Sequence, residues 1–92
     1  MINSFRHRGL KRLYEQGDRS KLPPAQVNRI EEIIFQLDVS KEAQHMNLPG
    51  YRLHKLTGAL KGFWSVKVSG NFRVIFRFEN GNAYEVDLLD YH

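Results

Sequence analysis

The sequence predicts an α+β fold in which two N-terminal helices pack on one face of a small, twisted antiparallel sheet. Apolar residues in the first half recur at helical spacing, those in the second half alternate, and glycine-containing turns separate the alternating runs. A length of 92 residues is near the small end of what one hydrophobic core supports. We therefore expect a single domain spanning residues 1–92.

The first predicted helix is centred on Leu10, Leu13 and Tyr14, which have i, i+3, i+4 spacing. Gly17 stands where the left-handed cap at the end of a helix belongs. The helix is therefore expected to end at about this glycine.

A second helix is expected to open at Pro23 and Pro24, because proline costs little in a first helical turn. Residues 40–46 are expected to add a short helical turn before Pro49 and Gly50 end the helical half. The apolar stripe of the second helix consists of Val27, Ile30, Ile33, Ile34 and Leu37.

The second half predicts strands in residues 51–56, 62–70 and 71–79 and in the last stretch of the sequence, because apolar and polar residues alternate there. In the first of these runs, Arg52 and His54 fall on one face and Leu53 on the other. The helices are expected to cover one face of the sheet and to leave the other open.

The turn near Asn80-Gly81 determines the register of the last two strands. A two-residue turn there opposes apolar side chains to acidic ones, so we expect a three-residue loop, 79–81, with Gly81 left-handed in a bulge. That loop pairs Phe76 with Tyr84, Val74 with Val86, and Phe72 with Leu88. The same reasoning at residues 69–71 pairs Val66 with Val74 and Val68 with Phe72.

In this register Lys67 lies opposite Arg73 on the open face. Like charges opposite each other destabilise a sheet by some tenths of a kcal/mol, and a bound anion such as phosphate removes that cost. Asp87, also expected across from Arg73, would orient the guanidinium. Arg52, His54 and Arg77 belong to the same face if the strands pair in order.

The last residues break the alternation at Leu88-Leu89. A bulge or strand end there is expected to bring Asp90 and His92 onto the open face, beside Arg73 and His54. Two imidazoles suit proton transfer near neutral pH, from a ribose 2′-hydroxyl and to a departing 5′-oxygen. The planar guanidinium suits the phosphate between them. The set is what metal-free RNA cleavage requires.

Composition limits the alternatives. The formal net charge is +4, and every charged residue between Tyr51 and Phe78 is basic, a pattern that attracts polyanions. The absence of cysteine excludes disulfides and thiolate metal sites, and no His pair has ligand spacing, so neither a metal nor a cofactor is expected. Without an apolar run long enough for a signal peptide or a membrane span, we expect a soluble cytoplasmic protein that does not contact a membrane.

Each candidate residue also has an ordinary structural explanation. His54 fits an exposed strand histidine, His92 a frayed terminus, Tyr91 packing, and Arg73 a surface ion pair with Asp87. Three classes of function therefore stay open on the residues alone: an RNA endonuclease, an inhibitor that acts by binding, and a non-catalytic RNA- or ribosome-binding domain.

The chain resembles the HigB toxins, a branch of the RelE-like toxin superfamily, along its whole length. The resemblance shows in "MINSFRHRGLKRLYEQG", "YRLHKLTG", "GFWSVKVSGNFRVIFRFENG" and the final "DYH". It implies a toxin of a type II toxin–antitoxin system, in a bacterial cytoplasm, that cleaves translated mRNA in the decoding site of the ribosome. It also implies silencing by a HigA-type antitoxin, a helix-turn-helix DNA-binding protein. The ParE-type toxins of the same superfamily, which poison DNA gyrase, lack the terminal Asp-Tyr-His.

By the same resemblance, His54, Asp90, Tyr91 and His92 form the catalytic set and Arg73 holds the scissile phosphate. Attack by the 2′-hydroxyl then gives a 2′,3′-cyclic phosphate and a 5′-hydroxyl. Which histidine is the base stays open, with a preference for His54. Related toxins can carry a lysine where this chain has Thr57. The basic residues expected to contact RNA are Arg52, Lys55, Lys67 and Arg77.

Overall fold

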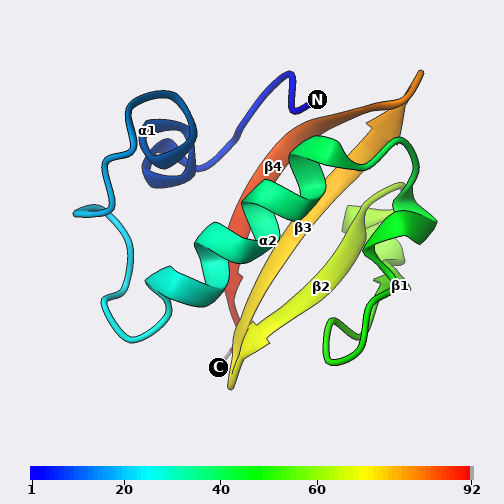
Figure 1. Ribbon diagram of the computed structural model, residues 1–92. Helices are drawn as coiled ribbons and strands as arrows, with labels where there is room; N and C mark the ends of the chain where they lie inside the picture. Colours follow the sequence, from blue (N-terminus) through cyan, green and yellow to red (C-terminus); the bar gives the residue numbers. More distant parts are fainter. Residues whose placement is uncertain (92) are drawn as a thin grey trace.

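The computed structural model describes residues 1–91 and confirms the predicted α+β architecture (Figure 1). Helices α1 (Arg8–Gln16) and α2 (Val27–Val39) precede a short 3₁₀ turn, η1 (Ala43–Met46). The strands are β1 (His54–Lys55), β2 (Trp64–Ser69), β3 (Phe72–Glu79) and β4 (Asn82–Asp90), with a second turn, η2 (Gly58–Leu60), between β1 and β2. The strands form one antiparallel sheet in the order β1-β2-β3-β4.

Helix α1 ends where the sequence predicts. Gly17 adopts a left-handed conformation with φ of 69°, and its N–H donates to the carbonyl oxygen of Leu13 at 2.9 Å. At the other end, the Nδ1 atom of His7 accepts a hydrogen bond from the N–H of Leu10. A histidine therefore caps the helix at a place where serine, threonine, aspartate or asparagine is more usual.

Helix α2 begins at Val27, so the expectation that the prolines open it is wrong. Pro23 instead starts a turn, in which its carbonyl oxygen accepts from the N–H of Gln26 at 2.9 Å. The helix proper follows this turn. The predicted stripe is nevertheless buried at Ile30, Ile33 and the two apolar positions that follow, Ile34 and Leu37.

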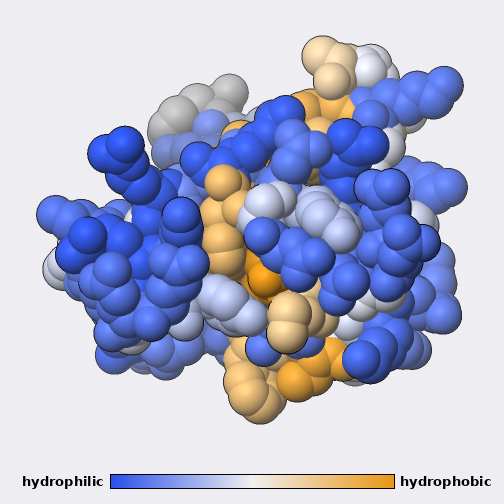
Figure 2. All heavy atoms as spheres, turned by 90° about the horizontal axis from the view of Figure 1, so that it is seen from above, coloured by the Kyte–Doolittle hydropathy of each residue, from blue (hydrophilic) through white to orange (hydrophobic). Residues whose placement is uncertain are grey.

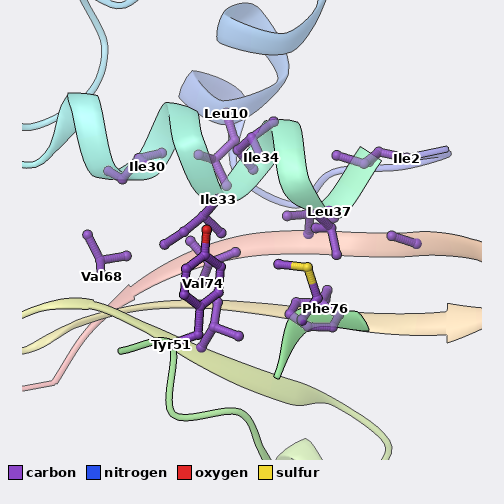
Figure 3. Packing of buried hydrophobic residues seen from close by; sticks show 14 of the residues in the cluster. Ile2, Leu10, Ile30, Ile33, Ile34, Leu37, Tyr51, Val68, Val74 and Phe76 are labelled. Carbon is purple, nitrogen blue, oxygen red and sulfur yellow. The ribbon is translucent and has the colours of Figure 1, made fainter. Parts of the chain in front are cut away.

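The core lies between α2 and one face of the sheet (Figure 3). Ile33 on the helix and Val74 and Phe76 on β3 are completely buried. Tyr51, just before β1, contributes its ring to the same cluster. Burial of such side chains supplies about 1.5–3 kcal/mol each, which makes this layer the main source of stability. Helix α1 adds Leu10 and Leu13 from the side.

The β3–β4 hairpin closes through a two-residue turn, so the predicted three-residue loop is wrong. Glu79 pairs with Asn82, and both residues of the turn have positive φ, 51° at Asn80 and 80° at Gly81. The register then shifts by one between Ile75 and Arg77, opposite a stretch of β4 that holds Glu85 at φ of 52°. Because of this bulge inside the strand, apolar residues of β3 and β4 again pair on the same face of the sheet.

Beyond the bulge, Val74 pairs with Leu88 and Ile75 with Asp87. The pairs expected from the three-residue loop are therefore replaced by others. In the β2–β3 hairpin, the expected pairs of Lys67 with Arg73 and of Val66 with Val74 are confirmed. The expected pair of Val68 with Phe72 is wrong, because Ser69 pairs with Phe72 instead. A second bulge, between Lys67 and Ser69, accounts for this one-residue shift in register.

The N-terminal residues form an additional edge that the sequence does not predict. Ile2 and Phe5 make parallel bridges to Ala83 and Val86 of β4. The N–H of Asn3 donates to the Ala83 carbonyl at 2.8 Å. This segment covers the outer edge of β4, which would otherwise present unpaired backbone groups.

The surface seen from above is mostly hydrophilic, with a narrow band of hydrophobic side chains across it (Figure 2). Phe35 and Val39 of α2 are the most exposed of the helical hydrophobics, at 70% and 54%. No helix in residues 1–91 is both long and apolar enough to cross a membrane.

Candidate functional site

The face of the sheet opposite α2, here called the helix-free face, includes two cross-strand rows that hold the predicted residues His54 and Arg73. Residues paired across antiparallel strands point to the same side, and neighbouring rows are about 7 Å apart along the strand. Ile75 is completely buried but does not belong to the core that the helices cover. This is consistent with its place on the helix-free face. The first row is His54, Ser65, Ile75 and Asp87, and the second is Lys67, Arg73 and Leu89.

Arg73 is held by backbone carbonyls. Its Nη1 donates to the carbonyl oxygens of Gly70, at 3.2 Å, and Phe72, at 3.1 Å. Lys67 stands directly across from it. Neither residue forms a salt bridge with any carboxylate of residues 1–91.

The predicted pairing of Arg73 with Asp87 is wrong. The bulge in β4 places Asp87 opposite Ile75, and its Oδ1 accepts from the N–H of Leu88 at 2.9 Å. Within residues 1–91, two cations therefore face each other and neither forms a salt bridge with a carboxylate. An oxyanion bound there would relieve their repulsion.

His54 lies exposed on β1 at the other end of the first row. Its Nδ1 is 3.1 Å from the carbonyl oxygen of Arg52. Because a carbonyl only accepts, this contact is a hydrogen bond in the tautomer that carries its proton on Nδ1. In neutral imidazole that tautomer leaves a lone pair on Nε2, which is able to accept a proton.

The alternation predicts that Arg52 and His54 lie on one face of the same strand, and this prediction is wrong. Strand β1 covers His54–Lys55 alone, and Arg52 lies before it with a left-handed φ of 50°. The contact between Arg52 and His54 is made by the backbone carbonyl of Arg52 and not by its side chain.

The strand order separates His54 on β1 from Arg73 on β3 by two strand spacings, about 10 Å across the sheet. Lys67 on β2 lies between them, opposite Arg73 and one row from His54. The structure thus gathers His54, Lys67 and Arg73 on one face, within the reach of long side chains around a common substrate.

The tail does not change phase at Leu88-Leu89, and that expectation is wrong. Leu89 pairs with Arg73 and Asp90 with Phe72, so the alternation runs on from the bulge to the end of β4. By this register, Leu89 shares the helix-free face with Arg73. Asp90 lies at the last rung of the ladder, on the same side as Phe72.

Tyr91 is nevertheless held beside the β2–β3 turn. Its N–H donates to the carbonyl oxygen of Asn71 at 2.9 Å, and its side chain is 44% exposed. This bond brings the tail to within two residues of Arg73 along β3. His92 lies outside the described residues.

Arg77 differs from the other predicted RNA contacts because its charge is already paired. Its Nη1 is 3.0 Å from Glu85, which also pairs with Arg6 at 3.2 Å. Both guanidinium groups lie over the ring of Phe63, at 5.7 Å and 4.9 Å from its centroid. This cluster covers the end of the helix-free face that lies away from Arg73.

Sequence reasoning missed Ser65. The residue is completely buried in the first row, between His54 and Ile75, and its Oγ has no hydrogen-bond partner among the described residues. The sequence did contain a signal: in the alternation of β2, Ser65 is a hydroxyl residue at a position that faces away from the helices. Within residues 1–91, no three His, Cys, Asp or Glu side chains come together in a group that could hold a metal ion.

A model of RelE-like toxins of type II toxin–antitoxin systems, of the HigB type, matches residues 3–92. The chain belongs to the HigB-like toxin family. It is 42% identical over 92 residues to Endoribonuclease HigB from Proteus vulgaris, with full coverage of both chains. It is 32% identical over 97 residues to Toxin HigB-1 from Vibrio cholerae, covering 100% of this chain and 98% of that toxin.

Solved structures show the same fold at low sequence identity. The YoeB–YefM toxin–antitoxin complex from Staphylococcus aureus contains a chain with a TM-score of 0.60 and 18% identity, covering 100% of this chain and 98% of that one. YafQ from Escherichia coli has a TM-score of 0.55 at 8% identity, covering 98% and 93%. The HigB-like chain thus shares the RelE-like fold with toxins of other families.

Proposed function

We propose that this HigB-like chain is an endoribonuclease toxin that cleaves mRNA during translation, in the decoding site of the ribosome. The observation that carries the proposal is the opposition of Lys67 and Arg73, without a carboxylate partner among residues 1–91, beside an exposed histidine. The full-length similarity to a protein named an endoribonuclease supports the same reaction.

In this proposal His54 accepts the proton of the ribose 2′-hydroxyl through Nε2, since its Nδ1 faces the Arg52 carbonyl. The 2′-oxygen attacks phosphorus, and the bond from phosphorus to the 5′-oxygen breaks. Arg73 and Lys67 hold the non-bridging oxygens as negative charge accumulates. His92 donates a proton to the departing oxygen. The products are a 2′,3′-cyclic phosphate and a 5′-hydroxyl.

The tail serves the same site. Tyr91 would contact a nucleotide next to the phosphate, and its hydrogen bond to Asn71 and its exposure support this role. Asp90 would orient an imidazole. Arg52 and Lys55 would contact the flanking RNA backbone, whereas Arg77, already paired with Glu85, would contribute less.

The ribosome supplies what the small site lacks. In-line attack requires the 2′-oxygen, the phosphorus and the leaving oxygen to be aligned, and a macromolecular partner that fixes the message removes the entropic cost of reaching that geometry. The toxin would act in the cytoplasm. A HigA-type antitoxin would silence it; the toxin–antitoxin complexes that share this fold support an antitoxin partner, without indicating its type.

The test is to map 5′ ends on mRNA after brief induction of the unmodified chain, His92→Gln and Lys11→Gln. We expect new 5′ ends within translated codons for the unmodified chain and for Lys11→Gln, whose exposed lysine lies on α1. His92→Gln should lower cleavage about 10²–10⁴-fold, the contribution of one general acid or base. Growth arrest by His92→Gln without new 5′ ends would instead indicate a toxin that acts by binding, on gyrase or on the ribosome.

A further inference from the structure

A hollow in the surface begins one residue beyond His54. It holds about 620 Å³ and lies where the loop through η2 joins β1 to β2. Leu56, Phe63 and Trp64 contribute large apolar side chains to its lining, and Lys55 and Lys61 line it as well. A volume of this size is typical of sites that hold a small organic ligand.

The hollow is positively charged. The Nζ of Lys55 lies 5.2 Å from the centroid of the Trp64 ring, a cation–π contact. Neither Lys55 nor Lys61 forms a salt bridge with any carboxylate in the described part of the chain. Both side chains are exposed. Lysine on its flexible stem can leave the ring and follow an anion.

The hollow lies next to the edge strand β1, which also carries His54 on the helix-free face. Lys55 pairs with Trp64, and His54 immediately before it pairs with Ser65. Successive residues of a strand point to opposite sides, so an RNA strand held at Arg73 would reach this hollow by passing around the short β1 edge.

We propose that the hollow binds one nucleobase of the RNA substrate, a neighbour of the cleaved phosphate, with the base against Trp64 and Leu56 and its phosphate between Lys55 and Lys61. A flat apolar wall with cations at its rim is the usual design for single-stranded nucleic acid. The identity of the ligand as substrate rests on the proposed function, but binding of a nucleotide to the hollow does not.

Trp64 makes the proposal directly measurable, because it is the single tryptophan of the chain and lines the hollow. We would titrate the full chain with adenosine and cytidine 5′-monophosphate and follow tryptophan fluorescence, excited at the red edge of the absorption band to avoid absorption by the bases. The expected result is a saturable change with a Kd on the order of 1 mM for one of the two. Ribose 5-phosphate, which lacks a base, should give no saturable change.

The lysines are tested by the double variant Lys55→Gln/Lys61→Gln against Lys11→Gln/Lys41→Gln, which removes two exposed lysines elsewhere. The first pair should weaken binding about 2- to 30-fold, as expected for losing two exposed charge contacts. The control should match the unmodified chain. Circular dichroism verifies that both fold.

The other outcomes separate the hypotheses. Equal binding of ribose 5-phosphate, or no effect of the first lysine pair, would overturn the base-binding site. Lysine-dependent binding of an acidic peptide in place of nucleotides would reassign the hollow to a protein partner. His92→Gln should leave the titration unchanged, so a failure of cleavage and a failure of base binding are observed independently.

Discussion

At the scale of the residue, the cations of the sheet differ in whether a carboxylate of residues 1–91 pairs with them. Arg77 and Arg6 share Glu85 and cover Phe63. Arg73 has backbone carbonyls as its partners and Lys67 as its neighbour across the ladder. A phosphate at Arg73 would therefore meet a charge that no carboxylate of residues 1–91 neutralises, whereas one at Arg77 would compete with Glu85.

This difference predicts unequal effects of two matched substitutions. Arg73→Ala should lower the rate of mRNA cleavage about 10²–10³-fold, the usual loss when one preorganised donor to a developing charge is removed. Arg77→Ala should have a much smaller effect on the rate. Cleavage of a reporter mRNA in a translation extract measures both. An equal loss for the two arginines, or a larger one at Arg77, would contradict the assignment of the phosphate to Arg73.

Ser65 gives a second prediction at this scale. Its buried Oγ has no partner among the described residues, and a buried hydroxyl left unsatisfied costs about 1–3 kcal/mol. Ser65→Ala should leave the free energy of unfolding unchanged or raise it, as measured by urea denaturation. Ser40 is the control, because its buried hydroxyl donates to the Gln36 carbonyl at 2.8 Å. Ser40→Ala should destabilise. A loss of stability in Ser65→Ala would show that its hydroxyl is satisfied in solution.

At the scale of the element, sequence patterns identified the helices and strands but misplaced two one-residue shifts. Alternation shows that an offset exists between β3 and β4, and it does not tell whether the extra residue lies in the turn or in the strand. The structure puts it in β4, where Glu85 has a positive φ. Glutamate carries no sequence signal for that conformation, which favours glycine and asparagine. Because of this misplacement, Asp87 and Asp90 were assigned to the wrong partners on β3. The pair of Lys67 and Arg73, on β2 and β3, does not depend on this offset and was assigned correctly.

The turn itself is testable through Asn80. In the two-residue turn, Asn80 has φ of 51°, which alanine adopts at a cost of about 1–2 kcal/mol and glycine without one. Asn80→Ala should therefore lower the free energy of unfolding by about 1 kcal/mol, with Asn80→Gly close to the unmodified chain. In a three-residue loop the same position would be right-handed, and alanine would be tolerated better than glycine. Urea denaturation of the two variants distinguishes these orders.

At the scale of the whole molecule, the sheet separates two tasks. Its covered face holds the core with α2, and its helix-free face gathers His54, Lys67 and Arg73 from three different strands. The grouping of these three residues was predictable, because it depends on strand order and on the pairing of Lys67 with Arg73, which was correct although the bulge beside the β2–β3 turn was not predicted. The end of the chain was not, since the position of Asp90 depends on the bulge at Glu85.

The carboxylate of Asp38 links the N-terminal segment and helix α1 to helix α2. Oδ1 of Asp38, on α2, accepts from the Tyr14 hydroxyl of α1 at 2.7 Å and from the N–H of Ile2 at 3.1 Å. The hydrogen bond to Asp38, then partial burial, and then the carboxylate charge raise the pKa of Tyr14 above its ordinary value of 10.0. Asp38 thus connects the N-terminal segment, α1 and α2 at a distance from the helix-free face.

Asp38→Ala should lower the free energy of unfolding by about 1–2 kcal/mol, the sum of two partly exposed hydrogen bonds. Glu42→Ala, which removes an exposed carboxylate from the same region, should not. Because the pKa of Tyr14 is raised in the folded state, its contribution is complete below about pH 10 and is lost as the pH rises further.

Tyr14→Phe should therefore flatten the fall in stability above about pH 10 that the unmodified chain shows, in urea denaturation across that range. Cleavage by folded Asp38→Ala should stay near the unmodified rate, because the carboxylate belongs to the helix layer and the proposed phosphate site lies on the opposite face of the sheet. If cleavage instead fell as far as it does in Arg73→Ala, the two faces would be coupled through the sheet, and the separation of core and site would have to be abandoned.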